Sequence, residues 1–358
     1  MSIKKVAQLA NVSIGTVSHY LNNKRFVSHD KVVKIENAIK KLNYIFNTRR
    51  PGPKTKERQG IKNGVIMLLA IGELSPIDIL KLPIFSDLLA GILEELEKYK
   101  MTFIFEYSST KRPVPEMLDK RFCDGVLILS LGENKIHSNL KSKLKGIPCV
   151  FCLKKHPDIA NQGKVITYNN RIVGELAANY MKSKNHKYVV FFNSEPQHSA
   201  YMEREKVFIN SCTKLNINAD IISIPSKLRH PENKYELLAE QFIQLKTKPT
   251  GAFFCADHCM IGVILALSKY NFSDSSIDIL GCNYETRYLS LLNPTPSSIN
   301  IQINKIGKIA VRELLERIND RKNKERNKDI ILSPEIILSN TTCKTYNSAI
   351  KGYKINLK

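Results

Sequence analysis

The segment IGTVSHYLNN, which begins at Ile14, carries side chains that can bond to the grooves and backbone of double-stranded DNA. Thr16 and Ser18 can exchange hydrogen bonds with phosphate oxygens, and His19 can reach the edge of a base. Ile14 can touch a thymine methyl group, whereas Gly15 offers no side chain. A surface of this composition can hold a duplex, but it reads few base pairs.

Two runs of apolar residues at helical spacing are expected to position these groups. The first run consists of Val6, Leu9 and Ala10, and the second of Val17, Tyr20 and Leu21. Between the runs, Asn11 can adopt the left-handed conformation that ends a helix, and Ser13 can cap the next one. Val12 fills the corner between them. Two short helices joined by a tight turn form a helix-turn-helix, whose second helix enters the major groove.

A third helix is expected to complete a small three-helix core. Ser28 can cap it, and Asp30 suits the positive end of its first turn. Its inner stripe consists of Val32, Ile35, Ile39 and Leu42. The residues expected to face DNA are Ser13, Ile14, Gly15, Thr16, Ser18, His19, Asn22 and Arg25. The alternative is a three-helix bundle that binds a protein partner.

The charge distribution favours nucleic acid as the partner. The chain has a formal net charge of +22, and residues 1–62 contain fourteen Lys and Arg against three Asp and Glu. Basic segments of this kind bind anionic polymers or surfaces. A generally basic proteome would explain the diluted excess in the remaining residues, but it does not explain the concentration in the first 62.

The cysteines suggest no metal site. Cys149 and Cys152 lie in IPCVFCL, which is typical of a buried strand, where residues three apart point to opposite faces. Cys255, His258 and Cys259 lie close together in CADHCM, but no second pair of ligands completes the set that zinc needs. We therefore expect packed, reduced thiols and no bound metal.

Motifs of enzymes, export and membrane insertion are also absent from the sequence. We find no GxxxxGK[ST], GxSxG or HExxH pattern and no pair of carboxylates that suggests catalysis. The longest apolar run, VIMLLAI, is far shorter than a membrane span, and no secretory signal is present. We expect a cytoplasmic protein that is neither an enzyme nor a membrane protein and has no cofactor.

The front of the chain resembles the DNA-binding domain of the LacI/GalR (lactose-repressor/galactose-repressor) family. That family follows a pattern close to I-x-D-V-A-x-x-A-x-V-S-x-x-T-V-S-x-x-x-N, then V-S, then L-x-Y-x-P-N. The matching positions are Val6, Ala7, Ala10, Val12, Ser13, Thr16, Val17, Ser18, Asn22, Val27, Ser28, Leu42, Tyr44 and Asn47. Lys5 and Phe46 depart from the pattern, where the family has Asp and Pro. The resemblance implies a sequence-specific transcriptional regulator, which we expect to be a repressor.

The segment after this domain departs further from the family. Members usually continue into a short hinge helix whose leucine wedges into the minor groove. This chain instead reads NTRRPGPKTKERQG, in which Pro51 and Pro53 disfavour a helix. Arg49 and Arg50 on such an extended basic segment can enter a narrow A·T-rich minor groove. Equally, the segment can be a solvated linker that only adds electrostatic affinity.

From about residue 61, strand-like and helix-like segments alternate. The strand-like runs are GVIMLLAI, TFIFEY, DGVLILS, IPCVFCL, KYVVFF, ADIISI, GAFFCA, DILGC and, near the end, IILSPEIIL. The helix-like runs include FSDLLAGILEELEKY, PEMLDKRF, residues near 135–145, VGELAANYMKS, residues 201–215, YELLAEQFIQL, MIGVILALSKY and KIGKIAVRELLERI. Such alternation predicts parallel sheets with helices on both faces, and the run is long enough for two doubly wound α/β lobes with a cleft between them.

The order of elements resembles the type I periplasmic-binding-protein fold that the LacI/GalR family joins to its DNA-binding domain. The resemblance implies a chain that passes three times between two lobes. The expected divisions are a helix-turn-helix domain at 1–47, a basic hinge linker at 48–62, an effector-binding and dimerisation domain at 63–342 and a basic tail at 343–358. Lobe one is expected to comprise 63–168 and 301–328, and lobe two 169–298 and 330–342.

The resemblance also suggests effector-binding residues. Phe85 aligns with an aromatic residue that stacks on the effector, and Arg204 aligns with an arginine that binds effector oxygens. Phe85 can instead be ordinary core, and Arg204 a surface charge. Asn169 and Asn283 stand where many members have aspartate. Asp257 keeps its acidic type, although it can simply cap the helix that follows it.

The two asparagines change the expected chemistry of the effector site. A carboxylate only accepts hydrogen bonds, whereas an amide both donates and accepts them, so the site would be less negative around Arg204. We expect a neutral or anionic small molecule, a sugar or sugar derivative. The family implies a homodimer on a near-palindromic DNA operator. The alternatives are a DNA-binding dimer whose body no longer responds to an effector, and a solute-binding protein.

Replacing Arg49 and Arg50 together by Ala distinguishes the two roles of the hinge. Insertion into the minor groove predicts a larger loss of affinity for operators with A·T-rich flanks than for G·C-rich ones, because the narrow groove concentrates negative potential. Titration of both operators at one salt concentration measures the difference. Equal losses on the two operators indicate a linker that contributes charge alone.

Overall fold

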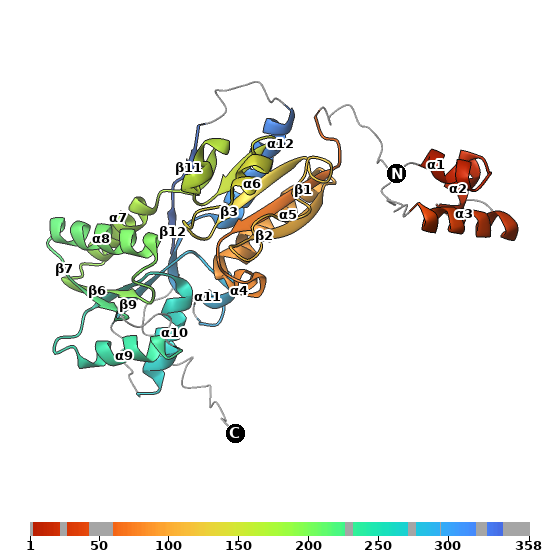
Figure 1. The fold of residues 1–358 in the computed structure, drawn as a ribbon. Coiled ribbons are helices and arrows are strands. Elements are labelled where there is room, and N and C mark those ends of the chain that lie inside the picture. Colours follow the sequence, from red (N-terminus) through yellow and green to blue (C-terminus); the bar gives the residue numbers. More distant parts are fainter. Residues whose placement is uncertain are drawn as a thin grey trace. The chain divides into compact units, whose positions relative to one another are not determined.

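The computed structural model describes two compact parts of the chain. They are Met1–Arg58 and Gln59–Lys358, and we treat each by itself (Figure 1). The described residues are 3–21, 27–42, 60–225, 232–270, 277–293, 295–319 and 328–338.

The first part contains three helices around one small core, as predicted. They are α1 (Ile3–Leu9), α2 (Ile14–Leu21) and α3 (His29–Lys41). The buried residues are Val6, Ala7, Ala10, Val17, Ile35 and Ala38. Leu9, which was expected to pack inward, is instead 46% exposed. The core therefore depends on small and β-branched side chains that let the short helices approach closely.

The turn between α1 and α2 follows its prediction. Asn11 has a positive φ of 50°, which ends α1, and the backbone N–H of Thr16 donates to Ser13 Oγ at 3.1 Å, which caps α2. Val12 packs against the core. The prediction for Ser28 is wrong in detail. It stands at the N-cap position of α3, but its side chain makes no capping hydrogen bond.

The second part contains two six-stranded sheets. The first has the order β11-β5-β4-β3-β1-β2, and the second β12-β10-β9-β8-β6-β7. Neighbouring strands are parallel in both, except that β12 is antiparallel to β10. The strands of the first sheet are β1 (Val65–Ile71), β2 (Thr102–Ser108), β3 (Gly125–Ser130), β4 (Cys149–Cys152), β5 (Val165–Tyr168) and β11 (Ile330–Leu332). Those of the second are β6 (Tyr188–Asn193), β7 (Asn218–Ser223), β8 (Gly251–Phe254), β9 (Asp278–Cys282), β10 (Ser297–Asn300) and β12 (Glu335–Ile337).

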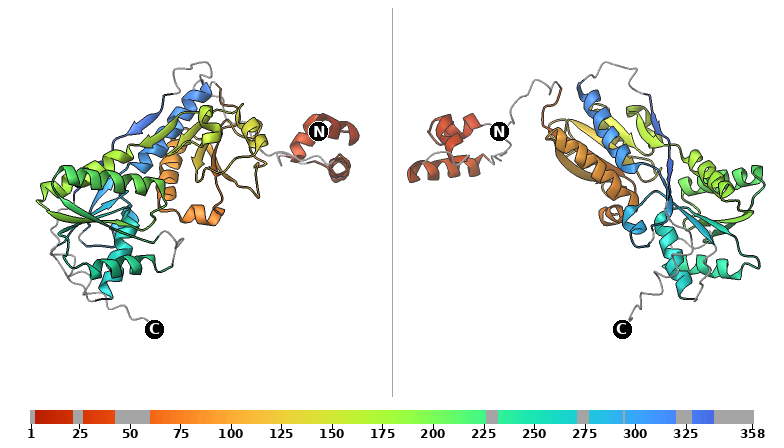
Figure 2. Two further views of the ribbon diagram at one scale, coloured as in Figure 1. Left: turned by 60° about the vertical axis from the view of Figure 1, so that its left-hand side comes forward. Right: turned by 180° about the vertical axis from the view of Figure 1, so that it is seen from behind.

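Helices accompany each sheet, so the predicted α/β class with two lobes is confirmed (Figure 2). The first lobe has α4 (Pro76–Lys81), α5 (Pro83–Lys98), α6 (Ser138–Leu144), the 3-10 helix η1 (Pro157–Gln162) and α12 (Ile303–Asn319). The second lobe has α7 (Asn170–Ser183), α8 (Ser199–Lys214), α9 (Lys234–Gln244), α10 (Asp257–Ser268) and α11 (Thr286–Leu289). Strand β1 is buried along its whole length, as a parallel strand covered on both faces should be.

The chain crosses between the lobes three times, and one predicted boundary is wrong. Ile330–Leu332 was assigned to lobe two, but it pairs in parallel with β5 and extends the edge of the first sheet. The last crossing therefore falls between Leu332 and Glu335. The split of IILSPEIIL into two three-residue strands is set by pairing partners, which the apolar pattern alone does not specify.

The helix predicted for PEMLDKRF is also absent from the structure. Residues 115–122 form successive turns instead. The side chain of Asp119 accepts a hydrogen bond from the backbone N–H of Arg121 at 2.9 Å and pairs with the Arg121 guanidinium. Such local side-chain bonds to the backbone compete with helix formation. Leu118 alone of this apolar set is fully buried.

Asp124, which immediately precedes β3, fixes the beginning of the second part. Its carboxylate accepts hydrogen bonds from the backbone N–H groups of four consecutive residues. The donors are Lys62 at 2.8 Å, Asn63 at 3.0 Å, Gly64 at 2.7 Å and Val65 at 3.2 Å. A buried carboxylate with several backbone donors is well compensated, and the four N–H groups would otherwise lack partners.

Replacing Asp124 by Ala should destabilise the second part by about 2 kcal/mol or more, because it leaves several backbone donors unsatisfied. Glu116→Gln, which changes an exposed carboxylate in the same β2–β3 connection, should change stability by less than about 0.5 kcal/mol. Urea unfolding of both variants and the unchanged protein measures the effect. Equal stability of the two variants would contradict the role assigned to Asp124.

Candidate DNA-binding face and effector site

The N-terminal half of α2 and the turn before it form one accessible face of the first part. Ser13, Ile14 and Gly15 are exposed, and Ile14 retains 44% of its surface. Thr16, Ser18 and His19 are half-buried. The other residues predicted to contact DNA, Asn22, Arg25, Arg49 and Arg50, lie outside the described residues.

Local bonds orient two side chains of this face. The hydroxyls of Ser13 and Thr16 lie 2.9 Å apart and bond to each other, so both are held at the beginning of α2. His19 Nδ1 is shielded from solvent and has no hydrogen-bond partner within the described part of the chain. Any outward hydrogen bond of this ring must therefore use Nε2. On the neighbouring turn, the Tyr20 hydroxyl donates to Glu36 of α3 at 2.7 Å and ties the two helices together.

Arg204 lies at the centre of a buried polar network in the second lobe. It projects from α8 and is 1% exposed. Its Nε donates to Asn170 Oδ1 at 2.8 Å, its Nη2 to the Tyr168 hydroxyl at 2.9 Å, and its Nη1 to Asn283 Oδ1 at 3.0 Å and the Cys255 carbonyl. All four acceptors are neutral. None of these contacts supplies a negative charge to balance the guanidinium.

Asn283 connects Arg204 to a charged pair. Its Nδ2 donates to Glu285 Oε1 at 3.1 Å, while the other carboxylate oxygen lies 3.2 Å from His258 Nδ1. Burial alone raises the pKa of Glu285, but the hydrogen bonds and charge of His258 outweigh it and lower that pKa. Burial likewise lowers the pKa of His258, and Glu285 outweighs it and raises that pKa. The carboxylate is therefore already paired within the protein.

Asp257 is fully buried beside this pair. It accepts hydrogen bonds from the backbone N–H of Glu285 at 2.7 Å and from the Ser298 hydroxyl at 2.8 Å. Burial, together with the charge of Glu285, raises the pKa of Asp257 to about 8. Its side chain does not cap α10, so the capping role considered for it is wrong. It instead joins the beginning of α10 to β10 and to the loop after β9.

The remaining predicted effector residues lie outside this network. Asn169 Oδ1 accepts a long hydrogen bond from the backbone N–H of Ile172 at 3.4 Å, which caps α7. Phe85 lies in the first turn of α5, is 1% exposed, and packs edge-on against Phe105 with ring centroids 5.5 Å apart. Thus Arg204 and Asn283 are in direct contact, Asp257 reaches them through Glu285, and Phe85 belongs to the first-lobe core.

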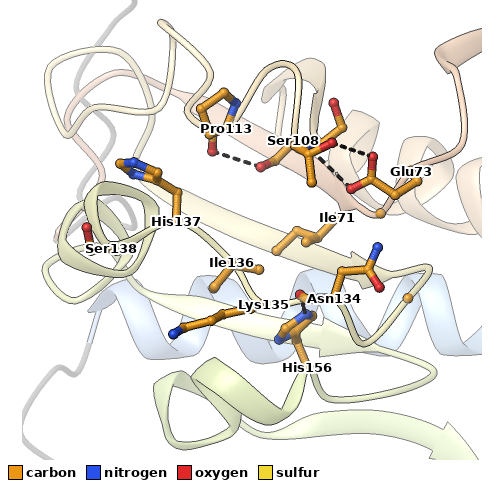
Figure 3. Close-up of a pocket in the computed structure, with 14 residues that line it drawn as sticks. Ile71, Glu73, Ser108, Pro113, Asn134, Lys135, Ile136, His137, Ser138 and His156 are labelled. Atoms are coloured by element: carbon orange, nitrogen blue, oxygen red, sulfur yellow. Dashed lines mark hydrogen bonds between the residues drawn. The ribbon is translucent and has the colours of Figure 1, made fainter.

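A cavity of about 490 Å³ lies in the first lobe, at the carboxyl ends of its strands (Figure 3). Its lining includes Ile71, Glu73, Ser108, Thr110 and Ile136. The sequence analysis did not identify these residues. Their signal is their place directly after predicted strands, because the carboxyl ends of parallel strands meet at one edge of a sheet.

Residues 2–47 match the family described as bacterial regulatory proteins, lacI family, and residues 178–342 match a periplasmic binding protein-like domain. The HTH-type transcriptional repressor PurR of Histophilus somni is 25% identical over 344 residues, which cover 94% of this chain and 97% of the relative. PurR of Pasteurella multocida is 25% identical over 349 residues, with the same coverage. The chain belongs to the LacI/GalR family of transcriptional regulators.

Solved structures of LacI-family regulators share the fold. A CelR–cellobiose complex has a TM-score of 0.60 and 17% identity, covering 95% of this chain and 99% of that one. A LacI-family regulator of Enterococcus faecium with bound ribose has a TM-score of 0.62 and 17% identity, covering 77% of this chain and 98% of that one. At this identity the likeness shows the fold.

The family membership makes this chain a DNA-binding transcriptional regulator and not an enzyme. Within the described residues, none of the helices has the length and apolar character needed to span a lipid bilayer. The expected helix-turn-helix front and periplasmic-binding-protein-like body are both confirmed.

Replacing Asp257 by Asn should make the stability of this LacI/GalR regulator less dependent on pH. The folded protein keeps the Asp257 proton up to about pH 8, whereas an unfolded chain releases it near pH 4. Between these values the folded state binds the extra proton, so the contribution of this group to the free energy of unfolding falls as pH rises. The limit is about 1.4 kcal/mol per pH unit.

Asn can keep both hydrogen bonds of Asp257 but cannot titrate. The variant should therefore gain stability relative to the unchanged protein as pH rises from about 5 to about 7.5. Urea unfolding at several pH values measures the difference. Parallel stability curves for the two proteins would contradict a raised pKa at Asp257.

Proposed function

We propose that this LacI/GalR regulator is a homodimeric repressor that binds a near-palindromic operator and is controlled by a small-molecule effector bound between its two lobes. The observation that carries the proposal is the exposed N-terminal half of α2, in a three-helix unit that matches the lacI family. In helix-turn-helix proteins this half of the second helix contacts base edges in the major groove.

Each residue of the face has a proposed contact on the duplex. Ser13 and Thr16, held together at the beginning of α2, donate to phosphate oxygens, as does Ser18. His19 uses Nε2 at a base edge, and Ile14 contacts a thymine methyl group. Few side chains reach the bases, so one face reads a short half-site. Two faces in a dimer are needed to reach genomic specificity.

The basic residues supply sequence-independent affinity. The net charge of +11 within residues 1–62 is enough to neutralise several phosphates in each half-site. Release of counterions then makes affinity fall steeply with salt, with a slope that reports the number of phosphates neutralised. Asn22, Arg25, Arg49 and Arg50 remain proposed contacts of this kind.

The second-lobe network supports a neutral or anionic effector. Arg204 is buried with neutral acceptors only, and the nearest carboxylate of the network, Glu285, already pairs with His258. An uncompensated buried guanidinium is costly, so an anionic or strongly accepting ligand group would stabilise this wall. A sugar or sugar derivative fits that requirement. Two regulators of the same fold are described with bound cellobiose and ribose.

The body is proposed to couple the effector to the operator. The three crossings between the lobes are the places where their relative orientation can change. An effector shifts the equilibrium between two orientations only by its difference in affinity for them. A shift in orientation would alter the spacing of the two DNA-binding units of the dimer, and so the fit to the two half-sites.

Two other functions predict different behaviour after deletion of residues 1–60. A regulator loses operator binding and keeps effector binding. A dimer whose body no longer responds would lose operator binding and bind no effector in either form. A solute-binding protein would bind its ligand without any dependence of the full chain on DNA.

Replacing His19 by Ala should weaken operator binding by about 1–3 kcal/mol and relax the preference at one base pair in each half-site. Asn37→Ala, which changes an exposed residue of α3, serves as the control and should leave the preference intact. Binding to operators varied one base pair at a time measures both effects. A uniform loss over all operators, with no change of preference, would show that His19 contacts only the backbone.

A further inference from the structure

The first-lobe cavity lies where ligands bind in open parallel sheets. Strand β1 lies between β2 and β3, so the connections after β1 and β3 leave the sheet on either side of a switch in strand order. Crevices at the carboxyl ends of strands beside such a switch are the usual ligand sites of this architecture. The cavity is lined by residues from Ile71 to His156 alone, and none of the five proposed effector residues contributes to it.

Glu73 supplies a held negative charge to this cavity. The backbone N–H of Thr110 donates to its Oε1 at 3.1 Å, and the Thr110 hydroxyl donates to its Oε2 at 2.9 Å (Figure 3). These two bonds lower the pKa of Glu73, which is otherwise open to solvent. A carboxylate has about four acceptor sites, so two bonds leave capacity for a ligand that donates.

The other walls combine apolar surface with engaged polar groups. Ile71 and Ile136 provide apolar contact, and Figure 3 shows both between Glu73 and His137. The Ser108 hydroxyl donates to the Pro113 carbonyl at 2.8 Å, so its oxygen is left as an acceptor. A site of this kind offers a flat apolar patch next to several hydrogen-bond acceptors.

His156 is part of the wall and does not compete for the ligand. Its Nδ1 accepts from the backbone N–H of Asp158 at 3.2 Å, so Nε2 carries the proton and donates to the Asn134 carbonyl at 3.1 Å. Both ring nitrogens are therefore occupied. Lys135 is the one cation among the lining residues, and it lies on an exposed part of the rim.

We propose that this first-lobe cavity binds a neutral polyhydroxylated molecule, a sugar or polyol, with Glu73 accepting hydrogen bonds from two of its hydroxyl groups. Such molecules present hydroxyl donors around an apolar ring face, which matches the carboxylate beside Ile71 and Ile136. An anion would meet the repulsion of Glu73. The inference rests on the proposed function in taking this molecule as the effector, and it assigns the selection of neutral sugars to Glu73 and Thr110.

The test is calorimetric titration of the full chain with a panel of small molecules. The neutral probes are D-ribose, D-glucose, cellobiose and sorbitol, the anionic probes ribose 5-phosphate and gluconate, and the amine probe glucosamine. At least one neutral probe should bind. Glu73→Gln should weaken that binding roughly tenfold or more, because a charge-assisted acceptor is lost. Glu116→Gln removes a carboxylate of the same lobe outside the cavity and should leave the affinity unchanged.

Each other outcome separates this inference from the proposed function. Equal affinity of the Glu73→Gln variant and the unchanged protein would overturn the role of Glu73 and leave effector binding in place. Binding of only anionic or only amine probes, or of none, would overturn the assignment of a neutral ligand. Binding through Glu73 without any change in operator affinity would uphold the cavity and contradict the proposed control of DNA binding. Thermal unfolding without ligand confirms that each variant is folded.

Discussion

The contact between α5 and α12 is the interaction that completes the first lobe and joins it to the second. A side chain at Gly91 would overlap the carbonyl oxygen of Asn304, and one at Gly307 would overlap that of Leu88, so the two helices touch backbone to backbone. Glu95, 2% exposed, receives Arg312 Nε at 2.7 Å and Nη2 at 3.0 Å beside this contact, and these bonds lower its pKa to about 2. Because α12 follows β10 of the second sheet, the first lobe cannot assemble without a segment that arrives from its neighbour.

Local physical chemistry was enough to predict the front of the chain. Asn11 and Ser13 end one helix and begin the next as their conformational and capping preferences require, and the apolar spacing around Val6, Val17 and Ile35 places the core. The alternation of apolar strands and amphipathic helices likewise predicted two α/β lobes. These features depend on neighbours in sequence, which a single chain displays directly.

Features that depend on distant partners were harder to predict. The strand Ile330–Leu332 looks the same whichever sheet it joins, and only its pairing with β5 assigns it to the first lobe. Phe85 stacks on Phe105 of the first-lobe core, a contact set by the docking of α5 on β2. The burial of Arg204 among neutral acceptors, and the meeting of Glu73 with Thr110 in one cavity, likewise arise from strand ends far apart in the sequence.

The most direct measurement for the whole account is the affinity of the full chain for a duplex that carries a site recovered by genome-wide mapping of bound DNA, taken over a range of salt concentrations. The account predicts tight binding to that site, a steep linear fall of the logarithm of affinity with the logarithm of salt, and much weaker binding to a scrambled duplex. Affinity that does not vary with salt, or that is equal for the two duplexes, would contradict the placement of α2 against the bases.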